Sequence, residues 1–362
     1  MDNNNDLSNI NKNSICKLKE KNNTSLNLAV DDFSLYLNVI GGHSLFIEIS
    51  PNLLIKSASE NEIMFYEHSY EQCNPSIFIP HYNGKILRNS ENFAKIENYV
   101  IQCKKFFKNY ILKNKLTAEE INIEKEQKFL DIFAEFIKNK NESEGNTIVL
   151  NKSFEELEKK LDSIQKCKLK WILFWFIKWK ENFLSNDYII IENLTFNMNV
   201  PAILDIKLGS SPRYSKEKKT VKVFGGATNQ MGCRIMGLQK NFNFKNRYDT
   251  KNFTIDQFHE EIFNFFINNS NNQINVNLIN QTLKNIAIIK KEVQENKHFL
   301  MKFSSILIVY DFINDSNVRI NLIDFSYYEQ CPDSKEYLFA KNDFLQSLNN
   351  LIKVLEECKN TI

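Results

Sequence analysis

The sequence predicts an α+β protein of two lobes. Its 362 residues exceed what one typical hydrophobic core accommodates, and 43% of them are hydrophobic, as in globular proteins. Short segments with strand-like patterns lie within 35–57, 188–209 and 303–325, and longer segments with helical spacing separate and follow them. These patterns favour two bodies that each combine strands with helices.

Charge and cysteine usage exclude several classes of protein. Lys plus Arg (46) nearly balances Asp plus Glu (44), so the net charge does not indicate a nucleic-acid-binding protein. A binding site for a polyanion would have to come from a local cluster of basic residues. The seven cysteines form no CxxC pair and the five histidines lie far apart. We therefore expect reduced thiols and no zinc site, while magnesium carried by a nucleotide stays open.

The start of the chain, MDNNNDLSNINKNS, has no basic region followed by an apolar one and does not resemble a secretory signal. The longest aromatic run, WILFWFI at 171–177, is far shorter than the roughly 20 residues that span a bilayer. Lysines flank this run, which leaves a membrane-surface helix as the alternative to a buried one. We expect a soluble monomer of the cytoplasm, the nucleus or both, with no transmembrane segment and no nucleic-acid partner.

The N-terminal third begins with residues 1–33, whose Asn, Lys and Ser content predicts a disordered tail. Segments 35–50 and 53–57 then predict two strands around a turn at Pro51. Residues 92–183 are predicted to be mostly helical and to form an excursion of the first lobe.

Lys56 lies where the second of these strands ends. The next segment, SENEIMFYE, predicts a helix that carries Glu60, Glu62 and Glu67. In nucleotide kinases a strand lysine neutralises the phosphates, and an acidic residue on the following helix holds that lysine. A solvated lysine at a strand end is the alternative.

YIIIENL, residues 188–194, predicts a short apolar strand that breaks into a polar stretch before the next strand. This pattern is typical of a hinge between lobes. An ordinary crossover would have the same sequence pattern.

PAILDIKLG, residues 201–209, predicts the central strand. Its alternation places four apolar side chains on one face and Ile203, Asp205 and Lys207 on the other. Asp205 and Lys207 should then stand about 6.6 Å apart, since a strand rises about 3.3 Å per residue. Both charges are costly in a buried strand unless they pair or face a polar cleft. A structural ion pair and a ligand site are the two interpretations.

A basic run follows this strand, with five cations and a single acid within ten positions: Arg213, Lys216, Lys218, Lys219 and Lys222. On a helix, Lys218, Lys219 and Lys222 would converge on one face. The run therefore predicts either polyphosphate binding or a solvated face.

The C-terminal part predicts helices over 252–300 with a break at 268–272, two strands at 303–311 and 318–325, and a final helix over 342–358. Asp324 ends the second of these strands. A carboxylate held rigidly at a cleft suits a magnesium ligand, and a cap of the following turn is the alternative.

Several of these segments resemble the inositol polyphosphate kinase family. PAILDIKLG fits its PxxxDxKxG signature, GGH and FYE precede the signature, and MGCRIMGLQ, SSILIVYD and IDF follow it in the family's order. GGH is similar to the inositol hexakisphosphate kinase branch. The resemblance implies a two-lobed kinase-like fold with an antiparallel sheet in each lobe and an ATP cleft between them. The lobes would be 34–192 and 193–362, the second containing the inositol phosphate-binding segment.

The resemblance also implies roles for individual residues. The ATP-binding residues would be Lys56, Glu62, Glu192 through its carbonyl, Leu194 through its N–H, Asp205 at the ribose and Asp324 through magnesium. The substrate-binding residues would be Lys207, Arg213, Lys218, Lys219 and Lys222. The catalytic residues would be Lys207, Asp205 and Asp324, with a general-base role for Asp205 as the alternative to ribose binding.

The implied reaction is ATP-dependent phosphorylation of inositol hexakisphosphate to a diphosphoinositol (pyrophosphate) product. Alternatives are a multikinase or trisphosphate kinase acting on a free hydroxyl, and a pseudokinase that only binds inositol polyphosphate. Protein kinase and P-loop chemistry are not favoured, because HRD, DFG, GxGxxG and GxxxxGK[ST] motifs are missing from the sequence. One departure from the family is Ser326 with Tyr327, where a small residue and then His or Lys are common.

Overall fold

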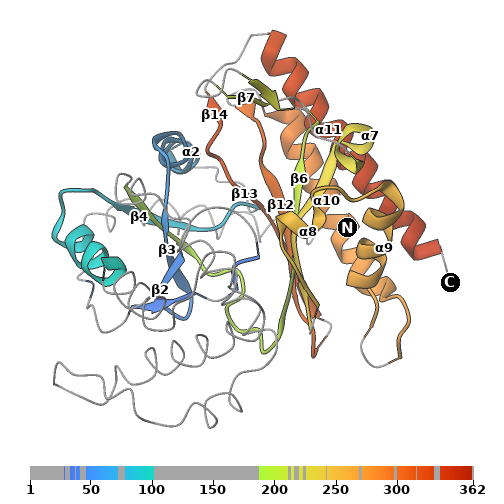
Figure 1. The fold of residues 1–362 in the computed structure, drawn as a ribbon, viewed down its shortest axis with the longest axis horizontal. Helices are drawn as coiled ribbons and strands as arrows, with labels where there is room; N and C mark the ends of the chain where they lie inside the picture. The colour runs from blue at the N-terminus through green and yellow to red at the C-terminus, as the bar shows by residue number, and fades with distance from the viewer. Residues whose placement is uncertain are drawn as a thin grey trace, which may run out of the picture.

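A computed structural model of the chain describes residues 28, 33–36, 38–40, 46–71, 78–101, 187–210, 213–215, 220–222, 226–241, 243–268, 271–296, 300–314, 316–329 and 335–360. These residues contain two five-stranded antiparallel sheets together with helices, so the predicted α+β class with two sheets is confirmed (Figure 1). Most of the predicted tail, the GGH segment and most of the helical excursion lie outside the described residues. Leu28 and Phe33 of the predicted tail are described and buried, so the disordered-tail prediction is wrong at these two residues.

The first sheet has the strand order β1-β2-β3-β5-β4. Its strands are β1 (Ser34–Leu35), β2 (Phe46–Ser50), β3 (Leu53–Ser57), β4 (Tyr82–Ile86) and β5 (Tyr188–Glu192). The two strands predicted on either side of Pro51 pair with each other, and β5 lies between β3 and β4. α2 (Glu60–Glu71) follows β3 where a helix was predicted, and residues 91–101 are also helical.

The second sheet has the order β10-β9-β6-β12-β13. Its strands are β6 (Pro201–Leu208), β9 (Cys233–Lys240), β10 (Asn243–Lys245), β12 (Ser305–Asp311) and β13 (Ser316–Ile323). The predicted central strand is therefore β6. Its even-numbered residues lie in the main hydrophobic core, whereas Ile203 packs in a separate small cluster, so the predicted alternation is confirmed.

Helices cover the face of the second sheet that points away from the first sheet (Figure 1). They are α9 (Ile255–Phe265), α10 (Val276–Glu295) and α11 (Lys335–Asn360), with the short α7 (Ala227–Met231). The short α8 (Arg247–Thr250) contributes residues to the cleft between the sheets. The side chains of Thr254 and Asn275 accept backbone N–H groups and so begin α9 and α10, the second of which follows the predicted break at 268–272. Within the described ranges, no helix is both long and apolar enough to cross a bilayer.

Two small antiparallel sheets complete the fold: β7 (Arg213–Ser215) with β8 (Thr220–Lys222), and β11 (Leu300–Met301) with β14 (Tyr328–Glu329). The prediction of a helix through the basic run is therefore wrong at both ends of the run, where Arg213 and Lys222 lie in strands. Arg213 lies opposite Lys222, and the β-branched Thr220 and Val221 favour a strand over a helix. Lys216, Lys218 and Lys219 lie outside the described residues.

Candidate active site

A cleft of about 520 Å³ lies between the two sheets. Seven of the residues predicted to bind ligand or catalyse line it: Lys56, Glu62, Glu192, Leu194, Asp205, Lys207 and Asp324. They come from β3, α2, β5, the hinge, β6 and the end of β13. Of the predicted basic run, Arg213 and Lys222 are described as backbone only, and Lys218 and Lys219 are not described.

Lys56 pairs with Glu62, which singles out one of the three acids predicted on the helix. The Lys56 Nζ lies 2.5 Å from Glu62 Oε1, and only 12% and 2% of the two side chains are exposed. Ser59 accepts the Glu62 N–H at 3.3 Å, which anchors the first turn of α2. Glu67 instead pairs with Lys85 at 2.8 Å. A buried acid thus holds the strand lysine at the cleft.

Lys207 pairs with Asp324, not with the nearby Asp205. The Lys207 Nζ lies 2.7 Å from Asp324 Oδ2, and the Ser326 hydroxyl donates to Asp324 Oδ1 at 3.1 Å. Asp324 follows β13 with a left-handed φ of 66°, which turns its carboxylate into the cleft. Burial would raise the pKa of Asp324, but the charges of Lys207 and Lys56 outweigh it and lower the pKa to about 2.

Asp205 is the least satisfied charged group of the cleft. It is 7% exposed, and its Oδ1 has no hydrogen-bond partner among the described residues. Burial raises the pKa of Asp205 to about 6, against the opposing effects of Lys207 and a hydrogen bond with Ser305. An orphaned, buried acceptor that lines a cleft is suited to receive a donor from a ligand.

The hinge after β5 is held by its own polar side chains. Asn193 donates through Nδ2 to the Pro51 carbonyl at 2.8 Å and accepts the Thr195 N–H at 3.0 Å. Arg319 donates to the Leu194 carbonyl at 3.1 Å. The Leu194 N–H itself meets no acceptor in the described part of the chain. These hydrogen bonds hold the hinge in place, and the Leu194 N–H stays available to donate to a ligand.

α2 also contacts the loop that carries Asp324. The rings of Phe65 on α2 and Phe325 stack with centroids 3.7 Å apart, and Tyr66 meets Phe325 edge to face. The Leu322 N–H donates to the Phe78 carbonyl. These contacts couple the element that holds Lys56 to the element that carries Asp324.

The structure adds cations that the sequence interpretation missed. We call Arg234, Arg247 and Lys251 the basic cluster, and all three line the same cleft. Arg234 lies directly opposite Lys207 in the β6–β9 register, and α8 is tied to β9 by the Thr250 hydroxyl, which donates to the Ile235 carbonyl at 2.6 Å. The sequence signal was the capped helix start NRYD with basic residues four positions apart.

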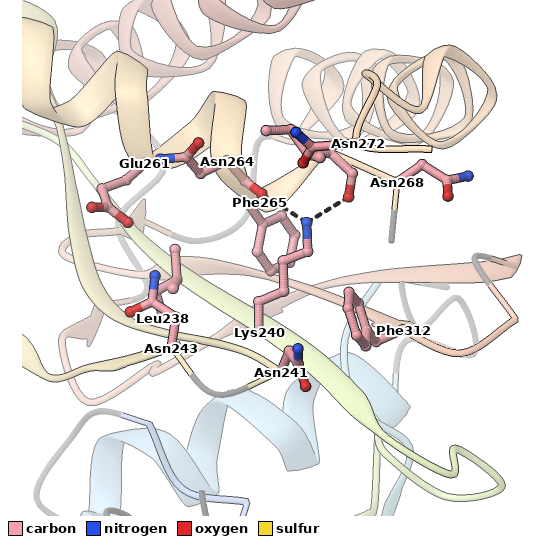
Figure 2. Close-up of a pocket in the computed structure, with 11 residues that line it drawn as sticks. Leu238, Lys240, Asn241, Asn243, Glu261, Asn264, Phe265, Asn268, Asn272 and Phe312 are labelled. Atoms are coloured by element: carbon pink, nitrogen blue, oxygen red, sulfur yellow. Dashed lines mark hydrogen bonds between the residues drawn. The ribbon is translucent and has the colours of Figure 1, made fainter. Parts of the chain in front are cut away.

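A second hollow, of about 250 Å³, lies beside the end of α9 (Figure 2). None of the predicted site residues lines it. Its Lys240 ammonium donates to the Asn264 carbonyl in the last turn of α9 at 2.7 Å and to the Ile267 carbonyl just beyond the helix at 2.6 Å. Glu261 is paired with Lys245. Lys240 and one oxygen of Glu261 thus have structural partners, whereas Glu261 Oε2 has none among the described residues. Because the predicted site residues line the cleft and not this hollow, the cleft is the candidate active site.

Asp324 fits the role of a single protein ligand for a nucleotide-borne metal. Mg²⁺ commonly uses one or two carboxylates and completes its shell with phosphates and water. Asp324 is ionised at neutral pH and lines the cleft. Within the described residues, no group of three or more His, Cys, Asp or Glu forms a separate metal cage.

Residues 188–356 match the sequence model of the family described as "Inositol polyphosphate kinase". The chain is similar to "Inositol hexakisphosphate kinase 2" of Oryctolagus cuniculus, with 28% identity over 34% of this chain and 32% of that protein. It is also similar to "Inositol polyphosphate multikinase" of Schizosaccharomyces pombe, with 28% identity over 40% of this chain and 60% of that protein. The match thus spans about a third of the hexakisphosphate kinase's length.

Among solved structures, the chain resembles "Inositol Phosphate Multikinase Ipk2 in complex with ADP and Mn2+" of S. cerevisiae. The TM-score is 0.40 at 22% identity, over 48% of this chain and 84% of that chain. The matched segment 188–356 and the two relatives described above confirm the family resemblance that the motifs indicated.

Proposed function

Because residues 188–356 are similar in sequence to the inositol polyphosphate kinases, we propose that this protein is an ATP-dependent inositol polyphosphate kinase. The observation that carries the proposal is the convergence of Lys56, Lys207 and Asp324 in one cleft. Phosphoryl transfer requires mainly positioning and positive charge around the migrating group. Two lysines and an ionised carboxylate that face one another satisfy that requirement.

Residues from both sheets, α2 and the hinge bind the nucleotide in this proposal. Lys56, held by Glu62, neutralises the phosphates, and the Leu194 N–H and Glu192 carbonyl bind adenine at the hinge. Asp205 accepts a ribose hydroxyl through its unpartnered Oδ1. Asp324 would hold Mg²⁺, which would supply positive charge to stabilise the phosphoryl transfer.

Lys207 contacts both the transferred phosphoryl group and the acceptor. The substrate's remaining phosphates bind the basic cluster, whose Arg234 is the cross-strand neighbour of Lys207. Arg247 and Lys251 extend this positive surface along α8. Arg213, Lys218, Lys219 and Lys222 stay proposed as further phosphate ligands.

The proposed acceptor is inositol hexakisphosphate, and the product is a diphosphoinositol. Hexakisphosphate has no free hydroxyl, so the attacking atom is a phosphate oxygen that is already largely ionised at neutral pH and needs little base assistance. The cleft suits this reaction, because Glu62 and Asp324 are engaged with lysines and Asp205 is assigned to ribose. Ser326 and Tyr327 supply no basic group at the position after IDF.

Product analysis tests the proposal. The full chain is incubated with magnesium and ATP and with inositol hexakisphosphate or inositol trisphosphate in parallel, and products are separated by anion exchange. We expect a more highly charged product from hexakisphosphate. Consumption of the trisphosphate alone would favour a multikinase or trisphosphate kinase. Binding of either compound without any turnover would indicate a pseudokinase.

A further inference from the structure

The described residues between β1 and β2 reach from the hinge onto the second sheet. We call the described residues of this segment, Tyr36 and 38–40, the strap. The Tyr36 hydroxyl and the Thr195 hydroxyl are 2.9 Å apart, and Asn38 Nδ2 donates to the same Thr195 oxygen at 3.3 Å. The strap is therefore anchored to the hinge by two hydrogen bonds.

The far end of the strap is buried against the floor of the cleft. Ile40 is 4% exposed and forms a hydrophobic cluster with Ile203 of β6 and Val309 of β12. Leu307 packs against the same cluster. A residue that precedes the first sheet's hairpin thus packs on the second sheet, on the face that carries Asp205 and Lys207.

The strap can lie this close to β9 because residue 237 is a glycine and has no side chain. A Cβ at residue 237 would lie 2.1 Å from the Ile40 carbonyl oxygen and 3.1 Å from the Ile40 Cβ, so any side chain there would displace the strap. Gly237 is also the register partner of Asp205. Directly opposite residues of paired strands share a face, so the Ile40 carbonyl lies beside Asp205.

We propose that the strap is a wall of the nucleoside site and that the Ile40 carbonyl and Asp205 Oδ1 together accept the two ribose hydroxyls. This inference rests on the proposed kinase function. Neither oxygen has a hydrogen-bond donor among the described residues. Val39 and Ile40 also line the cleft together with the apolar residues Leu54, Ile191, Leu307 and Ile323, which form a slot suited to a planar base.

Calorimetric titration of the full chain with ADP and magnesium tests the strap. Gly237→Ala displaces the Ile40 carbonyl, and Ile40→Ala keeps this carbonyl but removes the packing that holds it in place. Each variant should weaken ADP binding about ten-fold, which corresponds to one lost hydrogen bond. The affinity for inositol hexakisphosphate, titrated separately, should stay within two-fold. Ile279→Ala is the matched control, because Ile279 is fully buried under the opposite face of the sheet. It should lower the melting temperature and leave ADP affinity unchanged.

The 2′,3′-dideoxy analogue of ADP isolates the ribose contact. Wild-type protein should prefer ADP over the analogue, and Gly237→Ala should lose much of that preference, because moving the strap removes one of the two acceptors. An unchanged preference, or ADP affinities of both strap variants within two-fold of wild type, would overturn the inference while the kinase function stands. Wild-type protein that binds no ADP would refute the kinase function and the strap's role with it.

Discussion

Replacing Asp205 by asparagine should stabilise the ligand-free protein. Burial raises the pKa of Asp205 from 3.8 to about 6 in spite of Lys207 and the hydrogen bond with Ser305. A rise of about two pKa units means that folding disfavours the ionised carboxylate by roughly 3 kcal/mol. Asparagine has the same shape without the charge, and Lys207 keeps its partner Asp324. At pH 7 we expect Asp205→Asn to gain roughly 1–3 kcal/mol, or several degrees in melting temperature.

The stability difference between Asp205→Asn and wild type should depend on pH. Because the folded-state pKa of Asp205 is raised, its contribution to stability is fully present below about pH 4 and is lost as the pH rises through about 6. Urea unfolding between pH 4 and 7, without nucleotide or metal, should show the gap between variant and wild type widening with pH. A variant less stable than wild type at pH 7, or a gap that does not change with pH, would refute the reasoning.

The same variant separates the two proposed roles of Asp205. If Asp205 binds ribose, Asp205→Asn should raise the KM for ATP about ten-fold and leave kcat near its wild-type value. If Asp205 were a general base, kcat would fall by at least about 100-fold with little change in KM. Steady-state kinetics with both substrates varied distinguish these outcomes.

Three further predictions concern the charges around the cleft and the hinge. Lys207→Ala and Asp324→Asn should each lower turnover about 100-fold or more while the fold survives, because both groups stabilise transition-state charge; near-normal turnover in either would overturn the site assignment. Arg247→Ala combined with Lys251→Ala should raise the KM for inositol polyphosphate, most at low salt, and spare the KM for ATP; equal losses for both substrates would point to misfolding. Asp311→Asn should destabilise the protein, since backbone N–H groups lower the pKa of Asp311 against the effect of burial, and the wild-type stability it supplies should be lost as the pH falls below about 4; urea unfolding at pH 7 and pH 3 measures this, and a more stable variant would contradict it.

Local patterns predicted β3, β6 and β13, because these are apolar segments bounded by turn residues. They did not predict the strands β4 and β9. The partner of Lys207 could not be found in this way. Sequence spacing suggested Asp205, two residues away, whereas the structure pairs Lys207 with Asp324, 117 positions later, once β12 and β13 lie beside β6.

The basic cluster and the strap escaped prediction for a related physical reason. Basic residues on a short helix resemble any solvated surface until the fold turns them toward a cleft. The strap packs closely on β9 because Gly237 has no side chain. The sequence around a glycine does not reveal which distant segment will pack against it. The basic run was misread because only its lysine spacing was weighed, and not the strand preference of Thr220 and Val221.

The stack of Phe65 on Phe325 has a consequence for control of the proposed enzyme. Because the two rings lie face to face, an outward movement of α2 would expose both rings to solvent. The stack therefore keeps Glu62, which holds Lys56, close to the loop that carries Asp324. Many kinases are switched by moving the corresponding helix and loop apart. In this protein the aromatic stack opposes such a movement, so we expect the activity of the proposed enzyme to follow the concentrations of ATP and of the inositol phosphate.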